Sequence, residues 1–457
     1  VPVQILTIET ASLGDRSYLI HDGTTAAVID PQRDIDRVLD LVEEHGLTLG
    51  AVLETHVHND YVTGGLELAR RTGAAYHLSA DDEVRFEVSP VRDGDVIEVG
   101  TFTFRVLHTP GHTPTHLSYV ANDGQRDVAV FSGGSLLYGS VGRTDLVSAD
   151  LTEELTRAQH RTARRLAAEL DDEVEVRPTH GFGSFCSSGD TAGRETSTLG
   201  VERRDNQAFT IEDEDEFVRT LVAGLDAYPA YYAHMAPINR SGPADVDLSP
   251  VEVVNTTELL RRIHAGEWVV DLRTRTAFAS EHVTGTINIE LADNASTYLG
   301  WLLTWGTPVT LLADSSEEIE AMQRQLVRIG IDRPAGQFPG GPDAVGGGAD
   351  RGSYEVTDFA GLRAAVEERD DLVILDTRRQ LEWADGHLPD AVHVPLHELE
   401  ERIGEVPDGQ VWVHCASGYR SSIAASLLAC AGRDVVLVHD QFDEHAPEYF
   451  ELIVPGR

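Results

Sequence analysis

The chain has 457 residues, which is too long for one ordinary hydrophobic core and predicts two to four domains. Its 77 acidic residues outnumber 36 basic ones, the formal net charge is −41, and lysine is absent from the sequence. Such an acidic surface repels nucleic acid and anionic membranes, so neither is expected as a partner. The charge indicates either a solvated acidic coat or a surface that selects a basic partner.

Targeting and disulfide signals are weak. No run of 18 or more apolar residues occurs, and the start VPVQILTIET reads as a strand rather than as a signal peptide, so a cytoplasmic location is expected. The three cysteines, Cys186, Cys415 and Cys430, lie far apart in sequence. A disulfide scaffold is therefore not expected, and each thiol is considered separately.

The first 230 or so residues alternate between strand-like and helical patterns. A helix is expected within residues 148–170, with Asp150 as the N-cap. The segment HMAPINRSGPADVDLSP has three prolines and little periodicity, which predicts a linker at residues 236–250. Apolar runs predict strands at Gln4–Ile8, Tyr18–Ile20, Ala26–Ile29, Ala51–Leu53, Phe102–Val106 and Val128–Phe131.

Two later segments, Trp268–Leu291 and Leu372–Leu396, resemble each other and indicate an internal repeat at roughly 100-residue spacing. Each has a buried strand ending in Asp-(Leu/Thr)-Arg, a short helix and a second strand. The Gly-rich stretch between the copies predicts a flexible joint. The expected domains are therefore 1–235, 251–340 and 353–457, with linkers at 236–250 and 341–352.

The stretch VWVHCASGYRSS predicts a strand, a loop opened by Cys415 and a helix from Ser421. Backbone N–H groups of the loop and the helix N-terminus can face the sulfur, and Arg420 adds a fixed positive charge. These features favour a thiolate that attacks sulfur, and they suit an anionic substrate. Cys415 and Arg420 are the expected catalytic residues, and the loop residues expected to bind substrate are Ala416, Ser417, Gly418 and Tyr419. Cys430 is expected to be a core residue.

Four residues separate Cys415 from Arg420, a tighter loop than the five-residue spacing of phosphotyrosine phosphatases. Together with the upstream LDTRRQLEWADGHLPDAVHVP, residues 354–447 resemble the rhodanese family of sulfurtransferases. The resemblance implies an α/β domain that carries sulfane sulfur on Cys415. In the middle domain Asp314 stands where the nucleophile would lie, so the chain resembles a tandem rhodanese with an inactive first half.

Three histidine-bearing stretches, THVHND, TPGHT and PTHG, come in the order of the metallo-β-lactamase superfamily, which the first domain resembles. That resemblance implies an αββα sandwich with metals at the ends of strands. The whole chain is then an α/β and α+β multidomain protein, with this sandwich followed by two α/β rhodanese domains. His56, His58, His112 and His180 lie in the three loops, while His108 and His116 are expected to be structural or to support the metal ligands from behind.

Within that superfamily the chain most resembles the persulfide dioxygenases, with SYLI, VIDP and GRTDL in common. Those enzymes hold one ferrous iron with two histidines and one aspartate, and the motifs match two of these ligands to His56 and His112. Gly134 stands at the position of the aspartate, and Tyr61 replaces a histidine that would serve a second metal.

The expected metal site is therefore mononuclear and consists of His56, His58 and His112, with Asp60 and His180 as weaker contributors. The resemblance favours Fe(II), and Zn(II) also suits the set; no organic cofactor is expected.

Three further residues of the first domain have two interpretations each. Arg143, in a Gly-rich turn, either binds a substrate carboxylate or forms a structural ion pair. Asp30 ends a strand and is expected to support the site through hydrogen bonds. Cys186 either lies at the rim of the pocket or is an inert thiol.

The expected function is a sulfur-metabolism enzyme. Cys415 would move sulfane sulfur from thiosulfate or a persulfide to a small thiol such as glutathione, and the first domain would oxidise the thiol persulfide to sulfite. Two alternatives remain, a zinc-dependent thioester hydrolase with accessory rhodanese domains and a metal-free sulfur carrier. The expected partners are small sulfur compounds, and a homodimer or a higher homo-oligomer is compatible with the sequence.

Overall fold

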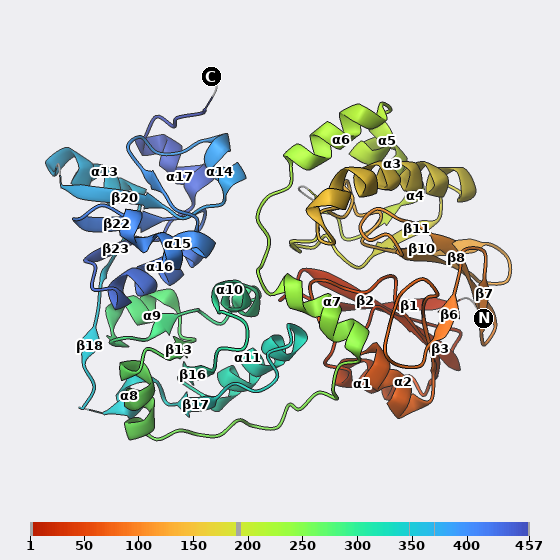
Figure 1. Ribbon diagram of the computed structural model, residues 1–457, viewed down its shortest axis with the longest axis horizontal. Helices are drawn as coiled ribbons and strands as arrows, with labels where there is room; N and C mark the ends of the chain where they lie inside the picture. The colour runs from red at the N-terminus through yellow and green to blue at the C-terminus, as the bar shows by residue number, and fades with distance from the viewer. Residues whose placement is uncertain (1–2, 189–192, 347, 370, 456–457) are drawn as a thin grey trace. The chain divides into compact units, whose positions relative to one another are not determined.

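Two six-stranded β-sheets form the N-terminal part of the protein (Figure 1). The computed structural model describes residues 3–188, 193–346, 348–369 and 371–455. The first sheet has the order β1-β2-β3-β4-β5-β6, and the second has the order β12-β11-β10-β9-β8-β7. The strands are β1 Gln4–Thr10, β2 Asp15–His21, β3 Thr25–Ile29, β4 Thr48–Leu53, β5 Ala75–Ser79, β6 Ser89–Val91, β7 Val96–Val99, β8 Phe102–His108, β9 Leu117–Asn122, β10 Asp127–Gly133, β11 Glu175–Pro178 and β12 Ser197–Thr198. All six strands expected in this region are confirmed.

The two sheets pack against each other through alternate residues of their strands. Tyr18 and Leu53 of the first sheet share one buried cluster with Phe104 and Phe131 of the second, and the rings of Tyr18 and Phe131 are 5.4 Å apart. Since successive side chains of a strand point to opposite faces, the outer face of each sheet needs a second cover. Helices provide it, which confirms the αββα sandwich.

Helices α1 and α2 pack on the outer face of the first sheet, and α3, α4 and α6 pack on the second. The helix expected within residues 148–170 is α3, preceded by the short 3-10 turn η1 (Ala149–Leu151). Ser148, not Asp150, is the cap, because the Ser148 side chain accepts the N–H of Asp150 and the turn begins earlier than expected. The helices are α1 Asp36–Glu44, α2 Gly65–Thr72, α3 Thr152–Glu169, α4 Leu199–Asp205, α5 Gln207–Thr210, α6 Glu214–Ala223 and α7 Tyr232–Ser241.

Residues 236–241, expected to be a linker, continue helix α7, so the sequence interpretation was wrong there. Pro237 removes one hydrogen-bond donor from the helix, but Met235 and Asn239 are buried and hold it against the first domain. The chain divides into two compact units, Val1–Asp247 with Leu326–Gly330, and Leu248–Gln325 with Ile331–Arg457. The main segment of the first unit thus ends inside the expected linker.

The second unit contains two parallel sheets with matching strand order, which supports the internal repeat. The middle sheet runs β15-β13-β16-β17, and the C-terminal sheet adds one strand at its edge, β19-β23-β22-β20-β21. The strands are β13 Trp268–Asp271, β14 His282–Val283, β15 Ile287–Asn288, β16 Val309–Ala313, β17 Gly336–Pro339, β18 Arg351–Gly352, β19 Glu355–Thr357, β20 Leu372–Asp376, β21 Val392–His393, β22 Gln410–His414 and β23 Val435–Val438. The helices are α8 Thr256–His264, α9 Arg275–Ser280, α10 Ala295–Leu302, α11 Ser316–Arg328, α12 Gly341–Val345, α13 Phe359–Glu368, α14 Gln380–Asp385, α15 Leu399–Arg402, α16 Tyr419–Cys430 and α17 Phe442–Tyr449, with 3-10 turns η2 Leu396–Glu398 and η3 Ile403–Glu405.

An aspartate–arginine pair braces each repeat in the same way. Asp271 is the last residue of β13, and its carboxylate approaches the guanidinium of Arg273 to 2.7 Å. Asp376 is the last residue of β20 and approaches Arg378 to the same 2.7 Å. Each arginine also donates to a carbonyl eight residues further on, that of Glu281 or Gly386. The two copies of the repeat therefore share the same Asp–Arg contact.

The segment 341–352, expected to be a flexible joint, is partly ordered instead. Residues 341–345 form α12, with Pro342 in the first turn, where its missing N–H costs nothing. Residues 351–352 form β18, which pairs antiparallel with β14 of the middle repeat. Gly347 of this segment lies outside the described residues. Of the helices within the described ranges, none has the length and apolar character to cross a bilayer.

Truncation of the Phe131 side chain should destabilise the sandwich strongly. Phe131→Ala removes a fully buried side chain from between the sheets, and we expect the free energy of unfolding to fall by about 3–5 kcal/mol. Denaturant unfolding followed by circular dichroism measures this. The control Val96→Ala, at a position 59% exposed, should change it by less than about 0.5 kcal/mol. Equal effects of the two substitutions would contradict the packing described.

Candidate functional site

Cys415 lies directly after β22, at the start of the loop that leads into α16. Its side chain is 2% exposed, the N–H of Gly418 donates to Sγ over 3.2 Å, and Ser421 Oγ is 3.5 Å from Sγ. Gly418 adopts φ 92°, a left-handed conformation that a side chain would strain, and it caps the helix. The sulfur therefore sits at a helix N-terminus and receives a backbone hydrogen bond, as expected from the sequence. The carbonyl of Ala416 accepts from the N–H of Phe442 at 2.8 Å.

Cys430, expected to be a core residue, is exposed, so that expectation was wrong. It is the last residue of α16, and its Sγ lies 3.5 Å from the carbonyl of Thr286. The apolar neighbours in its sequence belong to the buried part of the helix, which ends before this residue. Cys430 is therefore a thiol remote from the Cys415 loop.

Arg420, in the first turn of α16, forms a two-point ion pair with Glu382 of α14. Nη1 and Nη2 each approach a different carboxylate oxygen of Glu382 to 2.6 Å. Burial alone would raise the pKa of Glu382, but the hydrogen bonds and charge of Arg420 outweigh it and lower that pKa to about 2. The sequence indicated Arg420, whereas the role of Glu382 required the fold.

The middle repeat supports the same loop from outside. Arg275 Nη1 donates to the carbonyl of Ser417 at 3.3 Å, and Tyr419 Oη donates to the carbonyl of Glu290 at 2.8 Å. Arg275 and Glu290 form an ion pair of their own at 2.5 Å. Asp314 follows β16 just as Cys415 follows β22, so the middle repeat contributes contacts to the loop and has a carboxylate at the position of the nucleophile.

A small cavity opens beside Arg420. The middle repeat contributes Tyr298 and Trp301 to its wall, and the C-terminal domain contributes Arg379 and Arg420. The rings of Tyr298 and Tyr419 are 5.6 Å apart. The cavity has a volume of only about 10 Å³, and both guanidinium groups donate to Glu382, so it has room for no more than one water molecule.

The histidines of the first domain gather at one edge of the sandwich, each just beyond the end of a strand. His56 and His58 follow β4, His112 follows β8, and His180 follows β11. All four are at most 1% exposed. The rings of His56 and His58 are 4.1 Å apart, and those of His112 and His180 are 5.4 Å apart. The fold thus brings together the three histidine-bearing loops that the sequence indicated.

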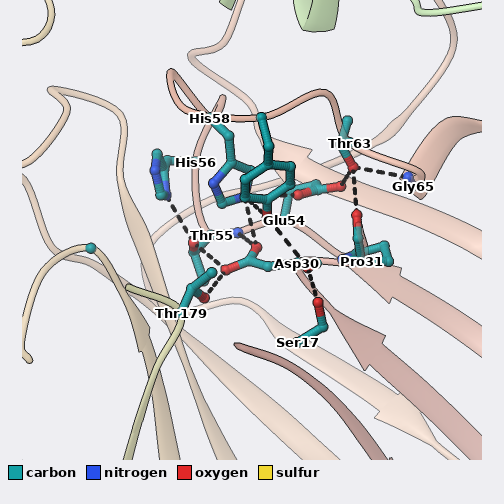
Figure 2. A network of polar contacts seen from close by, with 12 residues as sticks. Ser17, Asp30, Pro31, Glu54, Thr55, His56, His58, Thr63, Gly65 and Thr179 are labelled. Carbon is teal, nitrogen blue, oxygen red and sulfur yellow. Dashed lines mark hydrogen bonds and ion pairs between the residues drawn. The ribbon is translucent and has the colours of Figure 1, made fainter. Parts of the chain in front are cut away.

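Asp30 connects these loops (Figure 2). Its carboxylate accepts the N–H and the hydroxyl of Thr55, each at 2.7 Å, and the hydroxyl of Thr179, which precedes His180. Thr55 Oγ1 is also 2.9 Å from Nδ1 of His56. Asp30 has φ 50°, a conformation rare for a non-glycine residue and typical of functional sites. The supporting role expected for Asp30 agrees with these contacts.

His58 lies beside the carboxylates of Glu54 and Asp30 (Figure 2) and also contacts the hydroxyl of Tyr61. Its Nε2 lies 3.1 Å from Glu54, 3.3 Å from Asp30 and 2.9 Å from the hydroxyl of Tyr61. Burial alone would lower the pKa of His58, but the charge and hydrogen bond of Asp30, with those of Glu54, raise it to about 9. The ring of Tyr61 stacks on that of His58, and the Tyr61 hydroxyl occupies Nε2 of His58 as a hydrogen-bond partner.

His180 faces two carboxylates. Its Nδ1 lies 2.8 Å from Asp15 and 3.2 Å from Asp60, while its Nε2 lies 3.5 Å from Nε2 of His56. Burial would lower the pKa of His180, but the charges of Asp60 and Asp15 raise it well above its ordinary value. Burial, together with the charge of Asp60, raises the pKa of Asp15 to about 8. Asp15 was not indicated by the sequence, because it lies 165 residues from its partner.

Metal-ligand atoms in the described residues form overlapping groups, within each of which all atoms lie within 4.8 Å of one another. His56 and His58 group with His180, whereas His112 groups with His180 and Cys186. None of these groups is the set expected from the sequence, which was His56, His58 and His112. His180 belongs to both of the groups named above. The donors are imidazoles, a thiol and carboxylates, which fit a divalent ion such as Zn²⁺ or Fe²⁺.

Arg143 is buried and its side chain is engaged by the protein. Its guanidinium forms two hydrogen bonds with Asp145, at 2.7 and 2.8 Å, and Nη2 donates to the carbonyl of Asp226 at 2.7 Å. These contacts favour the structural ion pair over the substrate-binding role expected for Arg143. His116 is structural as expected, because its Nε2 accepts the N–H of Gly134 at 3.1 Å.

Sequence reasoning missed the role of α7. The side-chain amide of Asn239 donates to the carbonyls of His58 and Tyr61, at 3.0 and 2.9 Å, and its oxygen accepts the N–H of Thr63. One helical residue therefore fixes the histidine loop. No local motif signals this, because Asn239 lies in a segment that reads as a linker.

A cleft of about 1050 Å³ opens next to the histidine loops. Val57, Asn59 and Thr113, which flank the histidines, form part of its wall, and Tyr232 and Arg240 of α7 form another part. Its size suits a small organic molecule.

Comparisons with known proteins agree with this architecture. The model of the metallo-beta-lactamase superfamily matches residues 15–180, and that of the rhodanese-like domain matches residues 360–444. A hydroxyacylglutathione hydrolase of Aliivibrio fischeri is 31% identical over 247 residues, which covers 53% of this chain and 89% of the relative. A Staphylococcus aureus structure described as a metallo-beta-lactamase is 29% identical with a TM-score of 0.67, covering 74% of this chain and all of that one. The structure of ETHE1 from Myxococcus xanthus is 30% identical with a TM-score of 0.45, covering 52% of this chain and 98% of that one.

The ion pair next to Cys415 should stabilise the C-terminal domain in a pH-dependent way. Glu382→Gln leaves the partly buried Arg420 without this ionised partner, and we expect the substitution to cost about 1–3 kcal/mol at pH 7. Because the folded pKa of about 2 lies below the ordinary value of 4.5, this stabilisation is complete above pH 4.5 and is lost as the pH falls toward 2. The difference between wild type and variant should therefore narrow over that range.

Denaturant unfolding at a series of pH values measures the difference. Glu367→Gln is the matched control, since Glu367 pairs with Arg363 on the surface and should contribute less than about 1 kcal/mol. If Glu382→Gln costs no more free energy of unfolding than the control, the Arg420–Glu382 pair does not stabilise this domain.

Proposed function

Because the chain belongs to the metallo-beta-lactamase superfamily and carries a C-terminal rhodanese-like domain, we propose that it is a sulfur-metabolism enzyme whose Cys415 carries sulfane sulfur. The observation that supports this most strongly is the position of Sγ. Sγ lies at the N-terminus of α16, accepts a hydrogen bond from the N–H of Gly418 and is followed in the first turn by the partly buried Arg420. A helix N-terminus and a nearby guanidinium stabilise the negative charge of both a thiolate and a persulfide.

The transfer proceeds in two balanced steps. The Cys415 thiolate attacks the outer sulfur of thiosulfate, a sulfur–sulfur bond forms on the enzyme, and sulfite leaves with the electron pair of the broken bond. A small thiolate such as that of glutathione then attacks the outer sulfur of the enzyme persulfide and leaves as a thiol persulfide, which restores the Cys415 thiolate. The anionic donor would bind at the N-terminus of α16, where the N–H of Gly418 points at Sγ.

The first domain is proposed to consume that thiol persulfide. One persulfide, one dioxygen and one water yield one thiol, one sulfite and two protons. A ferrous ion bound by the buried histidines would supply the activation of dioxygen. The residues of this chain would bind the substrate in the cleft beside Tyr232 and Arg240 and keep the histidine loops in place through Asp30 and Asn239. Covalent connection of the two domains raises the effective concentration of a reactive intermediate.

A second candidate is a metal-dependent hydrolase of thioesters. The 31% identity to a hydroxyacylglutathione hydrolase, over 89% of its length, favours it. Tyr61 and Gly134 reduce the number of metal ligands and count against a dinuclear centre. A third candidate is a metal-free sulfur carrier. The observation that favours it is Gly134, which has no side chain to bind a metal.

Cys415→Ser is expected to lower thiosulfate sulfurtransferase activity by about 1,000-fold or more, because the variant lacks the sulfur nucleophile. Intact mass after incubation with thiosulfate should increase by one sulfur atom in the wild type and not in the variant. Cys430→Ser, which changes an exposed thiol on the far end of α16, is the control and should retain the activity. If the Cys415 variant keeps most of its activity, the nucleophile lies elsewhere.

Metal analysis combined with two assays separates the candidates for the first domain. We expect one equivalent of divalent metal per chain, oxygen consumption with glutathione persulfide, and loss of that consumption after chelation with restoration by Fe²⁺. Zinc in the protein with cleavage of an acyl-glutathione thioester would favour the hydrolase instead. A metal-free protein that still carries persulfide on Cys415 would favour the carrier.

A further inference from the structure

The ring of His112 occupies the space in which a ligand side chain at position 134 would begin. A Cβ atom on Gly134 would lie 2.2 Å from Cδ2 and 2.7 Å from Nε2 of this ring. A Cβ atom on Gly142 would lie 2.8 Å from its Nδ1. Both glycines therefore allow the backbone to approach the ring closely. A carboxylate at position 134 does not fit beside His112, so any metal ligand in addition to the histidines would come from another part of the chain.

Cys186 meets that requirement. The ligand atoms of His112, His180 and Cys186 lie within 4.8 Å of one another, and all three residues are 0% exposed. Nε2 of His112 is buried and has no hydrogen-bond partner among the described residues. Cys186 Sγ lies 3.8 Å from the hydroxyl of Tyr232, a long and weak contact.

We propose that Cys186 is a metal ligand of the first domain, together with His112 and His180, in place of the carboxylate that Gly134 lacks. Two imidazoles and one thiolate bind a divalent ion such as Zn²⁺ or Fe²⁺. On coordination the thiol releases its proton to solvent, since a coordinated thiol is deprotonated. This inference deepens the metal-dependent part of the proposed function and rests on it.

The backbone of Arg143 holds the two ligand loops together. Its carbonyl accepts from Nδ1 of His112 at 2.7 Å, and its N–H donates to the carbonyl of Cys186 at 2.8 Å. The first contact places the proton of His112 on Nδ1 and leaves a lone pair on Nε2 for a metal. The guanidinium of Arg143 donates to the carbonyl of Phe185, so the Cys186 loop is fixed from two sides.

His180 is prepared in a comparable way. Asp15 lies 2.8 Å from its Nδ1, and carboxylates commonly hold metal-binding histidines by the nitrogen that does not bind the metal. Asp60, 3.2 Å from the same nitrogen, adds negative charge that a divalent cation would compensate. The proposed ligands thus come from separate loops, each with its own support.

Cobalt(II) provides a direct test, because a cobalt–thiolate bond produces a charge-transfer absorption band in the near ultraviolet. In the full-length Cys415→Ser/Cys430→Ser protein, Cys186 is the only remaining thiol of the three in the sequence. We expect this protein to bind one equivalent of cobalt with the sulfur band. Adding Cys186→Ser should remove the band. It should also lower the cobalt affinity by about 10- to 100-fold or more, because that is the loss seen when only a residue supporting a metal ligand is removed.

Two outcomes would overturn the inference. Cobalt bound at one equivalent without a sulfur band in the Cys415→Ser/Cys430→Ser protein would exclude Cys186 as a ligand while leaving the metal-dependent function intact. If the wild type does not bind cobalt, both the Cys186 ligand and the metal-dependent function of the first domain are excluded. Sulfur loading of wild-type Cys415, measured by mass, tests the sulfurtransferase separately. Thermal unfolding and a parallel Cys186→Ala variant control for misfolding. The band expected in the Cys415→Ser/Cys430→Ser protein is measured with Cys186 intact, so it does not depend on how a Cys186 variant folds.

Discussion

The first domain depends on a buried carboxylate that satisfies several loops at once. Asp30 accepts from the backbone and hydroxyl of Thr55 and from the hydroxyl of Thr179, so it connects the loop after β4 with the end of β11. A buried charge without such partners would cost several kcal/mol, and each partner therefore has to be in place when the sandwich forms. His56 and His180 are next to these partners in sequence, and their positions follow from the same network.

In the C-terminal domain, the N-terminus of a helix stabilises the reactive sulfur. The sulfur of Cys415 lies at the start of α16, where unpaired N–H groups face outward, and Arg420 is kept in position by Glu382. The middle repeat lacks the thiol, yet it contributes hydrogen bonds to the loop through the guanidinium of Arg275 and the carbonyl of Glu290. It thus supports the loop, since an isolated loop of this length would lose order.

The first domain lacks two side chains that its resemblance to metal-binding families leads one to expect. Gly134 has no ligand atom, and Tyr61 binds His58 instead of a second ion. The side chains around the histidines are not random, because Asp15, Arg143 and Asn239 each orient a histidine or its loop. Burying such a network of polar groups without a ligand would cost free energy. A metal centre with fewer ligands therefore accounts for the arrangement better than a scaffold without a metal does.

Local patterns in the sequence determined six of the strands of the sandwich, the repeated Asp–Arg elements and the Cys415 loop, because each depends on residues close together in the chain. The helical state of residues 236–241 and the order of residues 341–345 and 351–352 were not evident, since buried contacts of Met235 and Asn239 and the pairing of β18 with β14 outweigh the local signals of proline and glycine. Only the tertiary structure placed Cys186 beside His112 and Asp15 beside His180, because loops that are distant in sequence meet where their strands end at one edge of the sandwich.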